Sequence, residues 1–126
     1  NLIIPANGYL VFVENIDSFN LAFPSVTNVI EYDGGSLSGG GETITLSNTI
    51  GGEVASVDYE TSAPWPAYSN TEAIELCDLT TDYTDGMNWY VAGTVSSTVA
   101  ETIYGTPGSA NSCAALPIIS TYDIDQ

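Results

Sequence analysis

The clearest pattern of hydrophobic and polar positions lies in the middle of the chain, where two segments alternate between the two classes. Residues 42–47 read Glu-Thr-Ile-Thr-Leu-Ser, and residues 53–60 place Ala55, Val57 and Tyr59 at every second position. A period of two puts successive side chains on opposite faces of a strand. Residues 48–52 read Asn-Thr-Ile-Gly-Gly, which is typical of a turn. The sequence therefore predicts a β-hairpin with one apolar face.

Four further short segments are rich in β-branched and aromatic residues and are bounded by turn signals. They are residues 9–13, 29–33, 72–78 and 88–92. The first reads Tyr-Leu-Val-Phe-Val and is apolar on both faces, which is typical of a central strand. No segment has the period of an amphipathic helix. This pattern predicts an all-β fold, an antiparallel sandwich or barrel.

Glycine and proline mark the loops between these segments. Glycines at residues 34–35 and 39–41 flank Ser-Leu-Ser, and the prolines of residues 63–66, Ala-Pro-Trp-Pro, end the hairpin because they cannot donate to a strand ladder. An acidic loop spans residues 78–86. We expect one β domain over residues 1–113, followed by residues 114–126 as a linker or as the first strand of a following domain.

The charge of the chain restricts its function. The 126 residues are 44% hydrophobic, enough for one domain with a core, but 16 Asp and Glu stand against no Lys, Arg or His, a net charge of −16. Nucleic acid is bound through cations that neutralise phosphates, so direct nucleic-acid binding is not expected. The chain also lacks the histidine or lysine that catalytic triads, most zinc enzymes and lysine-containing phosphate loops need. We expect a protein that is not an enzyme and has no catalytic residues.

The two cysteines of the chain, Cys77 and Cys113, bear on its location. In a cytosolic protein such a pair is usually two buried thiols, and two cysteine ligands without histidine are an incomplete metal site. We favour a disulfide between them, which indicates an oxidising compartment. The expected location is extracellular or at the cell surface, without membrane insertion, because no apolar run has the length of a membrane span.

Several short motifs along the chain occur in a specific order. They are residues 5–11 (Pro-Ala-Asn-Gly-Tyr-Leu-Val), 37–46 (Leu-Ser-Gly-Gly-Gly-Glu-Thr-Ile-Thr-Leu), 57–59, 63–66, 74–76, 88–89 and 105–111 (Gly-Thr-Pro-Gly-Ser-Ala-Asn). In this order they resemble the lamin tail domain, an immunoglobulin-like β-sandwich. The sequences around Cys77 and Cys113 are similar to those of Bacteroidota versions, which implies secretion, often through the type IX system.

The resemblance covers roughly the C-terminal two-thirds of such a sandwich. Members of the family begin with further strands that precede a Leu-x-Gly-Trp-like motif, so the resemblance implies a domain incomplete at its N-terminus. A sandwich without these strands exposes apolar surface and unpaired backbone. Three explanations stay open: a longer chain, which we favour, strands supplied by another chain, or a shortened domain. Residues 119–126 also resemble the first strand of an OB-like domain that follows such modules.

The acidic loop is the candidate metal site. Its oxygen ligands are Asp78, Asp82, Asp85 and Asn88. An all-oxygen set suits Ca²⁺, so we expect no cofactor other than Ca²⁺. The spacing differs from the EF-hand pattern, and we favour a solvated turn over a Ca²⁺ site. A second, weaker candidate consists of Asp123 and Asp125.

Paired carboxylates also occur on the predicted strands. Asp58 and Glu60 lie on one face of a strand, an arrangement that can serve glycoside hydrolysis, but a solvated outer face is the simpler interpretation. Glu72 and Glu75 are likewise expected on the polar exterior.

Aromatic residues provide the candidate binding surface. Trp65, between two prolines, and Tyr68 are an exposed platform for a sugar or a protein partner in one interpretation. In the other, Trp65 is a structural corner that closes one end of the sandwich. Trp89 is expected in the core.

Three functions are compatible with these features. We favour a non-catalytic extracellular β-sandwich module that acts as a spacer, tether or binding unit of a larger secreted or cell-surface protein. The alternatives are a structural subunit that assembles by β-strand exchange, and an accessory domain of a secreted nuclease or other hydrolase. The expected partners are other domains of the same protein, or protein or carbohydrate at the cell surface.

Overall fold

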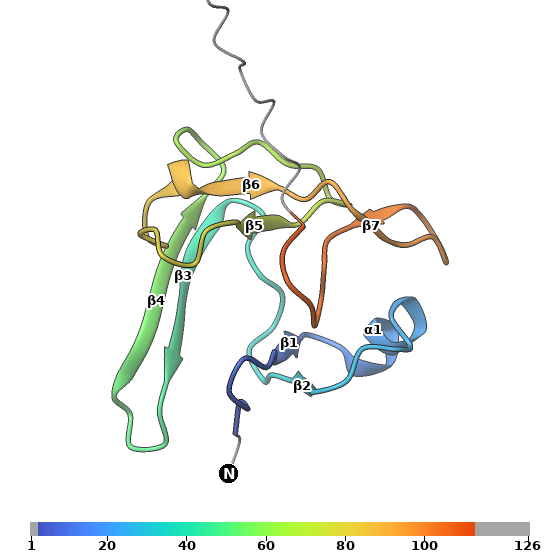
Figure 1. The fold of residues 1–126 in the computed structure, drawn as a ribbon, viewed down its shortest axis with the longest axis horizontal. Coiled ribbons are helices and arrows are strands. Elements are labelled where there is room, and N and C mark those ends of the chain that lie inside the picture. Colours follow the sequence, from blue (N-terminus) through green and yellow to red (C-terminus); the bar gives the residue numbers. More distant parts are fainter. Residues whose placement is uncertain (1–2, 113–126) are drawn as a thin grey trace, which may run out of the picture.

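A computed structural model of the chain describes residues 3–112. Its elements are short strands joined by long connections (Figure 1). In chain order they are β1 (Val11–Val13), α1 (Ile16–Ala22), β2 (Val29–Glu31), β3 (Gly41–Ser47), β4 (Glu53–Glu60), β5 (Ile74–Leu76), the 3-10 helix η1 (Gly86–Asn88), β6 (Trp89–Val91), β7 (Val95–Ser97) and β8 (Ile103–Tyr104).

The strands form four sheets of two strands each across the described residues. The pairs β3–β4, β5–β6 and β7–β8 are antiparallel, whereas β1–β2 is parallel. The predicted β-rich character is therefore confirmed, and the expectation of a purely antiparallel arrangement is wrong for β1. Residues 9–13, which the sequence predicts as a central strand, contain β1. Within the described residues β1 pairs only with β2, so it is not a central strand there.

The predicted hairpin is confirmed as β3–β4, which extends along one side of the molecule (Figure 1). Its register pairs Glu42 with Tyr59, Ile44 with Val57 and Leu46 with Ala55, and these pairs share the apolar face. On the polar face, the Thr43 hydroxyl donates to Asp58 at 2.8 Å, and Thr45 and Ser56 share a 3.0 Å hydrogen bond. In the turn, the Asn48 side chain accepts from the amides of Ile50 and Gly52.

Helix α1 contradicts the expectation that the chain has no helix. Asn15 caps its first turn, with its side chain accepting from the amide of Ser18 at 2.8 Å. The amide of Ile16 donates to the Glu31 carboxylate at 2.7 Å, which ties the helix to the end of β2. Two parallel strands need a crossover connection, usually helical, so α1 follows from the parallel pairing of β1 and β2.

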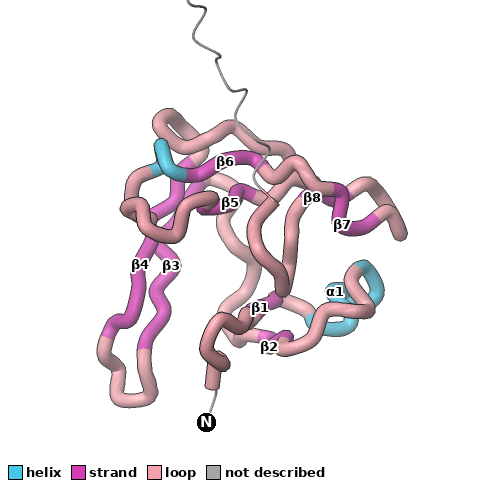
Figure 2. Tube along the Cα trace, viewed as in Figure 1, coloured by secondary structure: helices cyan, strands magenta, loops and turns pink. Residues whose placement is uncertain are grey.

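The strands β5–β6 and β7–β8 are linked through backbone hydrogen bonds outside the sheets. The amide of Ala92 donates to Ala73, the amide of Ala73 donates to Tyr104, and the amide of Tyr104 donates to Thr71. Figure 2 shows these short strands within a trace made largely of loops. Strands β7 and β8 lie in segments for which the sequence pattern predicts no element.

The hydrophobic core is thin. The buried apolar side chains are Val13, Tyr59, Trp65 and Ala92, and no described side chain is below 2% exposure. Large apolar side chains stay exposed along the hairpin, including Ile44 at 40% and Leu46 at 38%. No helix within residues 3–112 has the length and apolar character to cross a membrane.

The segment that precedes Cys113 packs against β5. The Asn111 side-chain amide donates to the Leu76 carbonyl at 2.8 Å, and the Ser112 amide donates to Glu75 at 3.2 Å. This brings the chain before Cys113 to the strand that precedes Cys77, as a disulfide between them would need. Cys113, the linker and strand expected over residues 114–126, and the acids Asp123 and Asp125 lie outside the described residues, so the disulfide stays a prediction.

Candidate functional site

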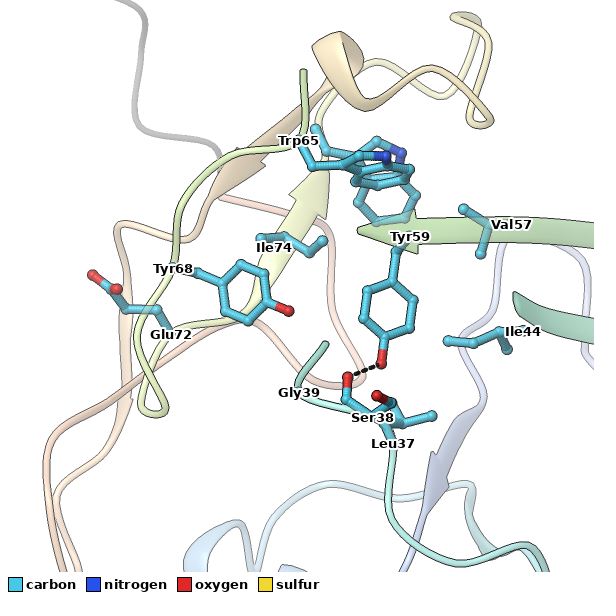
Figure 3. Close-up of a pocket in the computed structure, with 11 residues that line it drawn as sticks. Leu37, Ser38, Gly39, Ile44, Val57, Tyr59, Trp65, Tyr68, Glu72 and Ile74 are labelled. Atoms are coloured by element: carbon cyan, nitrogen blue, oxygen red, sulfur yellow. Dashed lines mark hydrogen bonds between the residues drawn. The ribbon is translucent and has the colours of Figure 1, made fainter. Parts of the chain in front are cut away.

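A cavity of about 370 Å³ lies against the apolar face of the hairpin. Its walls come from the loop before β3, from β3 and β4, from the segment 65–72, and from β5 and β6 (Figure 3). The lining residues are Leu37, Ser38, Gly39, Ile44, Val57, Tyr59, Trp65, Tyr68, Glu72, Ile74 and Trp89. Both residues of the predicted binding surface, Trp65 and Tyr68, are among them.

Tyr59 closes one wall of the cavity and is held at its hydroxyl. The hydroxyl donates to the Ser38 carbonyl at 2.6 Å (Figure 3). It also lies 3.3 Å from the Glu42 carboxylate, which itself accepts from the Ser38 amide. Burial, together with the negative charge of Glu42, raises the pKa of Tyr59. The phenol therefore stays protonated and acts as a hydrogen-bond donor that fixes the loop before β3.

Replacement of Tyr59 by phenylalanine should reduce the alkaline sensitivity of the fold. In the unfolded chain a tyrosine ionises near pH 10, and Tyr59 ionises higher in the folded state. The folded state thus keeps a proton that the unfolded state has lost, so stability falls as the pH rises above about 10. Urea unfolding midpoints should decline less in Y59F than in the parent chain between about pH 9 and 11. Equal declines would contradict this role of Tyr59.

Trp65 is a buried corner residue and not an exposed platform. It is 7% exposed, and its ring lies 5.6 Å from that of Trp89 with an interplanar angle of 40°. Gly86 lies directly against the indole, since a Cβ at this glycine would be 2.8 Å from the Trp65 ring. Trp89 is half-buried, and its indole N–H donates to the Tyr83 carbonyl at 2.9 Å. The structural interpretation of Trp65 therefore agrees with its packing.

Tyr68 and Glu72 form the more open side of the cavity. Both side chains are half-buried, and the Glu72 carboxylate points away from the aromatic rings (Figure 3). Hydrogen bonds from the backbone and side chain of Ser69 hold the pKa of Glu72 below its usual value. The hydrogen bond from the backbone N–H of Ser69 to the Glu72 carboxylate measures 2.7 Å. The interior of the cavity is therefore apolar and aromatic, and a carboxylate lies only at its rim.

The cavity is lined mainly by apolar groups. Its lining combines aliphatic and aromatic side chains with Ser38 and Glu72, and contains no histidine, cysteine or lysine that would activate a nucleophile. Clefts of this kind bury apolar groups of a ligand or partner. The sequence identified Trp65 and Tyr68, whereas Tyr59 and Glu42 were recognisable only as a cross-strand pair of the predicted hairpin.

The three aspartates of the candidate calcium site are used by local turns. The side chains of Asp78, Asp82 and Asp85 accept from the amides two residues further on, and the Thr80 and Thr84 hydroxyls add bonds of 2.6 Å. These hydroxyl and amide donors lower the pKa of Asp78 and Asp82. The side-chain amide of Asn88 donates to the Asp82 carbonyl at 2.8 Å.

The structure does not bring these acids together. Among the described residues, no group of three or more acidic, cysteine or histidine side chains is placed to hold a metal ion. The arrangement is a turn stabilised by its own aspartates, which is the interpretation that we favour from the sequence. Ca²⁺ binding by this loop stays a prediction without structural support.

Of the paired carboxylates, Glu75 departs most from its expected exposure, and Glu72 is half-buried at the cavity. Asp58 and Glu60 are exposed and accept from Thr43 and Ser62, as expected for an outer face. Glu75 was expected on the exterior, but it is 4% exposed because residues 105–112 fold over β5. No local pattern signals this, since the covering segment is distant in the sequence.

Comparison of the chain with protein families, with curated proteins and with solved structures found no match in any of the three.

Proposed function

We propose that this chain is a non-catalytic β module of a larger secreted or cell-surface protein, similar to a lamin tail domain, and that it is completed by a β-strand added along β3. The observation that carries the proposal is the exposure of the β3 side chains on the apolar face of the hairpin. Ile44 and Leu46 are about two-fifths exposed although they alternate as core positions do. A two-stranded sheet with one apolar face is rarely stable without further strands or a covering element.

Over residues 44–46, the side chains of β3 are more exposed than those of β4 opposite them. Across the pairs Ile44 with Val57 and Thr45 with Ser56, the β3 residue is exposed and the β4 residue is half-buried. In the described part of the chain β3 pairs only with β4 and β4 only with β3, so each strand has one edge without a strand partner. We place the added strand along β3 because its residues are the more exposed members of these pairs.

Between Thr43 and Leu46, strand β3 lacks the features by which proteins protect exposed edges, and its one charge on the apolar face, Glu42, lies near the end of the strand. Protected edge strands carry lysine, proline, inward charges or central bulges. Residues 43–46 of β3 read Thr-Ile-Thr-Leu, without charge or proline, and the irregularity in pairing occurs only at the end, between Leu46 and Ser47. Such an edge is suited to β-augmentation, in which a partner contributes main-chain hydrogen bonds and alternate side chains.

Aspartate substitutions on the apolar face test this proposal. In the 126-residue chain, I44D and L46D should each cost about 1 kcal/mol, because both side chains are already partly hydrated. In the native protein isolated from its source, each should cost about 3 kcal/mol or more, because the added strand buries the new charge. Urea unfolding of both proteins measures the difference.

The matched control is T45D, which places the same charge on the same strand but on the polar face. It should cost little in either protein, because Thr45 faces solvent beside Ser56. Equal costs of I44D in the isolated chain and in the native protein would overturn the proposal, since the apolar face would then stay uncovered.

A further inference from the structure

We infer that the strand bound by β3 is an amphipathic, basic segment that inserts one large apolar side chain into the cavity beside the hairpin. This inference rests on the proposed function and specifies the chemistry of the partner. It follows from three observations: the position of the cavity relative to β3, the lining of the cavity, and the charge of the chain.

The cavity lies level with the centre of β3. Ile44 is the central residue of β3 (Gly41–Ser47), and its side chain forms part of the cavity wall together with Val57, its partner on β4. In an added strand, the residue opposite Ile44 would share its face. The side chain of that residue would therefore extend toward the cavity. The partner residues two positions before and after it share the same face and would lie beside Leu46 and Glu42.

The size and lining of the cavity define the inserted group. A volume of about 370 Å³ is at the lower end of the range for ligand pockets. The rings of Tyr59, Tyr68 and Trp89 and the aliphatic side chain of Ile74 offer apolar contact, and the one carboxylate points outward (Figure 3). An aromatic or large aliphatic side chain fits this chemistry, and buried anchors of this kind dominate many interfaces.

Charge defines the outward residues of the strand. The polar face of the hairpin carries Asp58 and Glu60, and the chain contains no Lys, Arg or His that could pair with them. A second copy would bring another charge of −16 to the same face, so self-association is opposed. Lysine or arginine at alternate positions of the partner strand complements this surface.

Capped seven-residue peptides, as long as β3, test the inference with the 126-residue chain. The probe is Lys-Val-Lys-Phe-Lys-Val-Lys, its first variant has alanine in place of phenylalanine, and its second has glutamate in place of every lysine. The phenylalanine peptide should slow hydrogen exchange in β3 and change the fluorescence of the chain's two tryptophans, Trp65 and Trp89. The alanine peptide should bind about thirtyfold more weakly, and the glutamate peptide should not bind.

A variant whose own side chain fills the cavity separates two contributions to peptide binding: insertion of the phenylalanine into the cavity and backbone pairing with β3. Leu37 lines the cavity on an exposed loop at 56% exposure, so L37W can fill the space at little cost to the fold. In L37W the phenylalanine and alanine peptides should bind equally. L79W is the control, because Leu79 is 82% exposed and lies outside the lining. In L79W the thirtyfold difference between the peptides should persist.

The outcomes distinguish this inference from the proposed function. Equal slowing of β3 exchange by the phenylalanine and alanine peptides would overturn the anchor while supporting strand addition. No slowing by any peptide would count against both. Binding of the glutamate peptide, or concentration-dependent dimerisation of the chain in sedimentation, would overturn the basic partner. Loss of β3 protection on deletion of residues 114–126 would instead assign the added strand to the chain's own tail.

Discussion

Alanine at position 86 should destabilise the fold by about 2 kcal/mol, the cost of forcing additional volume into a packed site. A Cβ at Gly86 would lie 2.8 to 2.9 Å from three atoms of the Trp65 ring. Trp65 is among the few buried side chains, and it packs on Trp89. The indole or the backbone at residue 86 must therefore shift, which disturbs the packing of Trp65. Urea unfolding measures the loss, and near-UV circular dichroism should show the changed tryptophan pair.

The matched control is G39A, at a glycine that lines the cavity as Trp65 does. No atom lies within 4 Å of a Cβ at Gly39, and its φ is not in the left-handed region. Alanine there should be neutral or stabilise by about 0.5 kcal/mol, because it restricts the unfolded chain. Similar unfolding midpoints of G86A and G39A would show that the packing of Trp65 on Gly86 contributes little.

Leucine at position 75 should cost about 3 kcal/mol. The Glu75 carboxylate is almost fully buried, and it accepts from the Thr106 hydroxyl at 2.6 Å and from the Ser112 amide at 3.2 Å. Hydrogen bonds to a charged group are worth more than neutral ones, and E75L leaves both donors without their acceptor. Residues 105–112 should then detach from β5, which hydrogen exchange at Ser112 can detect together with the urea midpoint.

The control for Glu75 is E72L. Glu72 is half-exposed, and the hydrogen bonds to its carboxylate come from Ser69, three residues away. Its replacement should cost much less and should leave Ser112 protected. An unchanged or raised midpoint for E75L would contradict the account, since it would mean that desolvation of the carboxylate outweighs its hydrogen bonds.

The hairpin was predictable because its signal is local. Alternation over residues 42–47 and 53–60 and the turn at residues 48–52 predict the two strands and their apolar face. The register itself, which pairs Ile44 with Val57 and shifts between Leu46 and Ser47, is known only from the structure. The binding candidates Trp65 and Tyr68 could also be found, because an aromatic residue between prolines is visible without knowledge of the fold. Their roles could not be predicted from the sequence. Trp65 is a buried corner because it packs on Gly86, which is distant in the sequence, and Tyr68 is a cavity wall together with Ile74 of β5.

The parts that could not be predicted depend on distant contacts. Helix α1 is only seven residues long and follows from the parallel pairing of β1 with β2, which no local period encodes. Glu75 alternates with Ile74 and Leu76 and so resembled an outward position. It is buried because residues 105–112 return over β5. Strands β7 and β8 are likewise short and held by long-range bonds to Ala73 and Thr71.

The open face of the hairpin connects the sequence to the proposed function. An alternating strand normally buries its apolar residues, yet Ile44 and Leu46 stay exposed in a fold whose core is already thin. This mismatch between pattern and burial is what an incomplete sandwich predicts. A strand along β3 would cover these residues and provide the backbone partners that an edge lacks.

Hydrogen–deuterium exchange across β3, compared between the 126-residue chain and the native protein isolated from its source, tests this claim most directly. Backbone amides exchange slowly when they are paired and quickly when they face solvent. The account predicts that the outward amides of residues 41–47 exchange quickly in the isolated chain and slowly in the native protein, while β4 changes little. Equally fast exchange of these amides in both proteins would contradict the addition of a strand to β3.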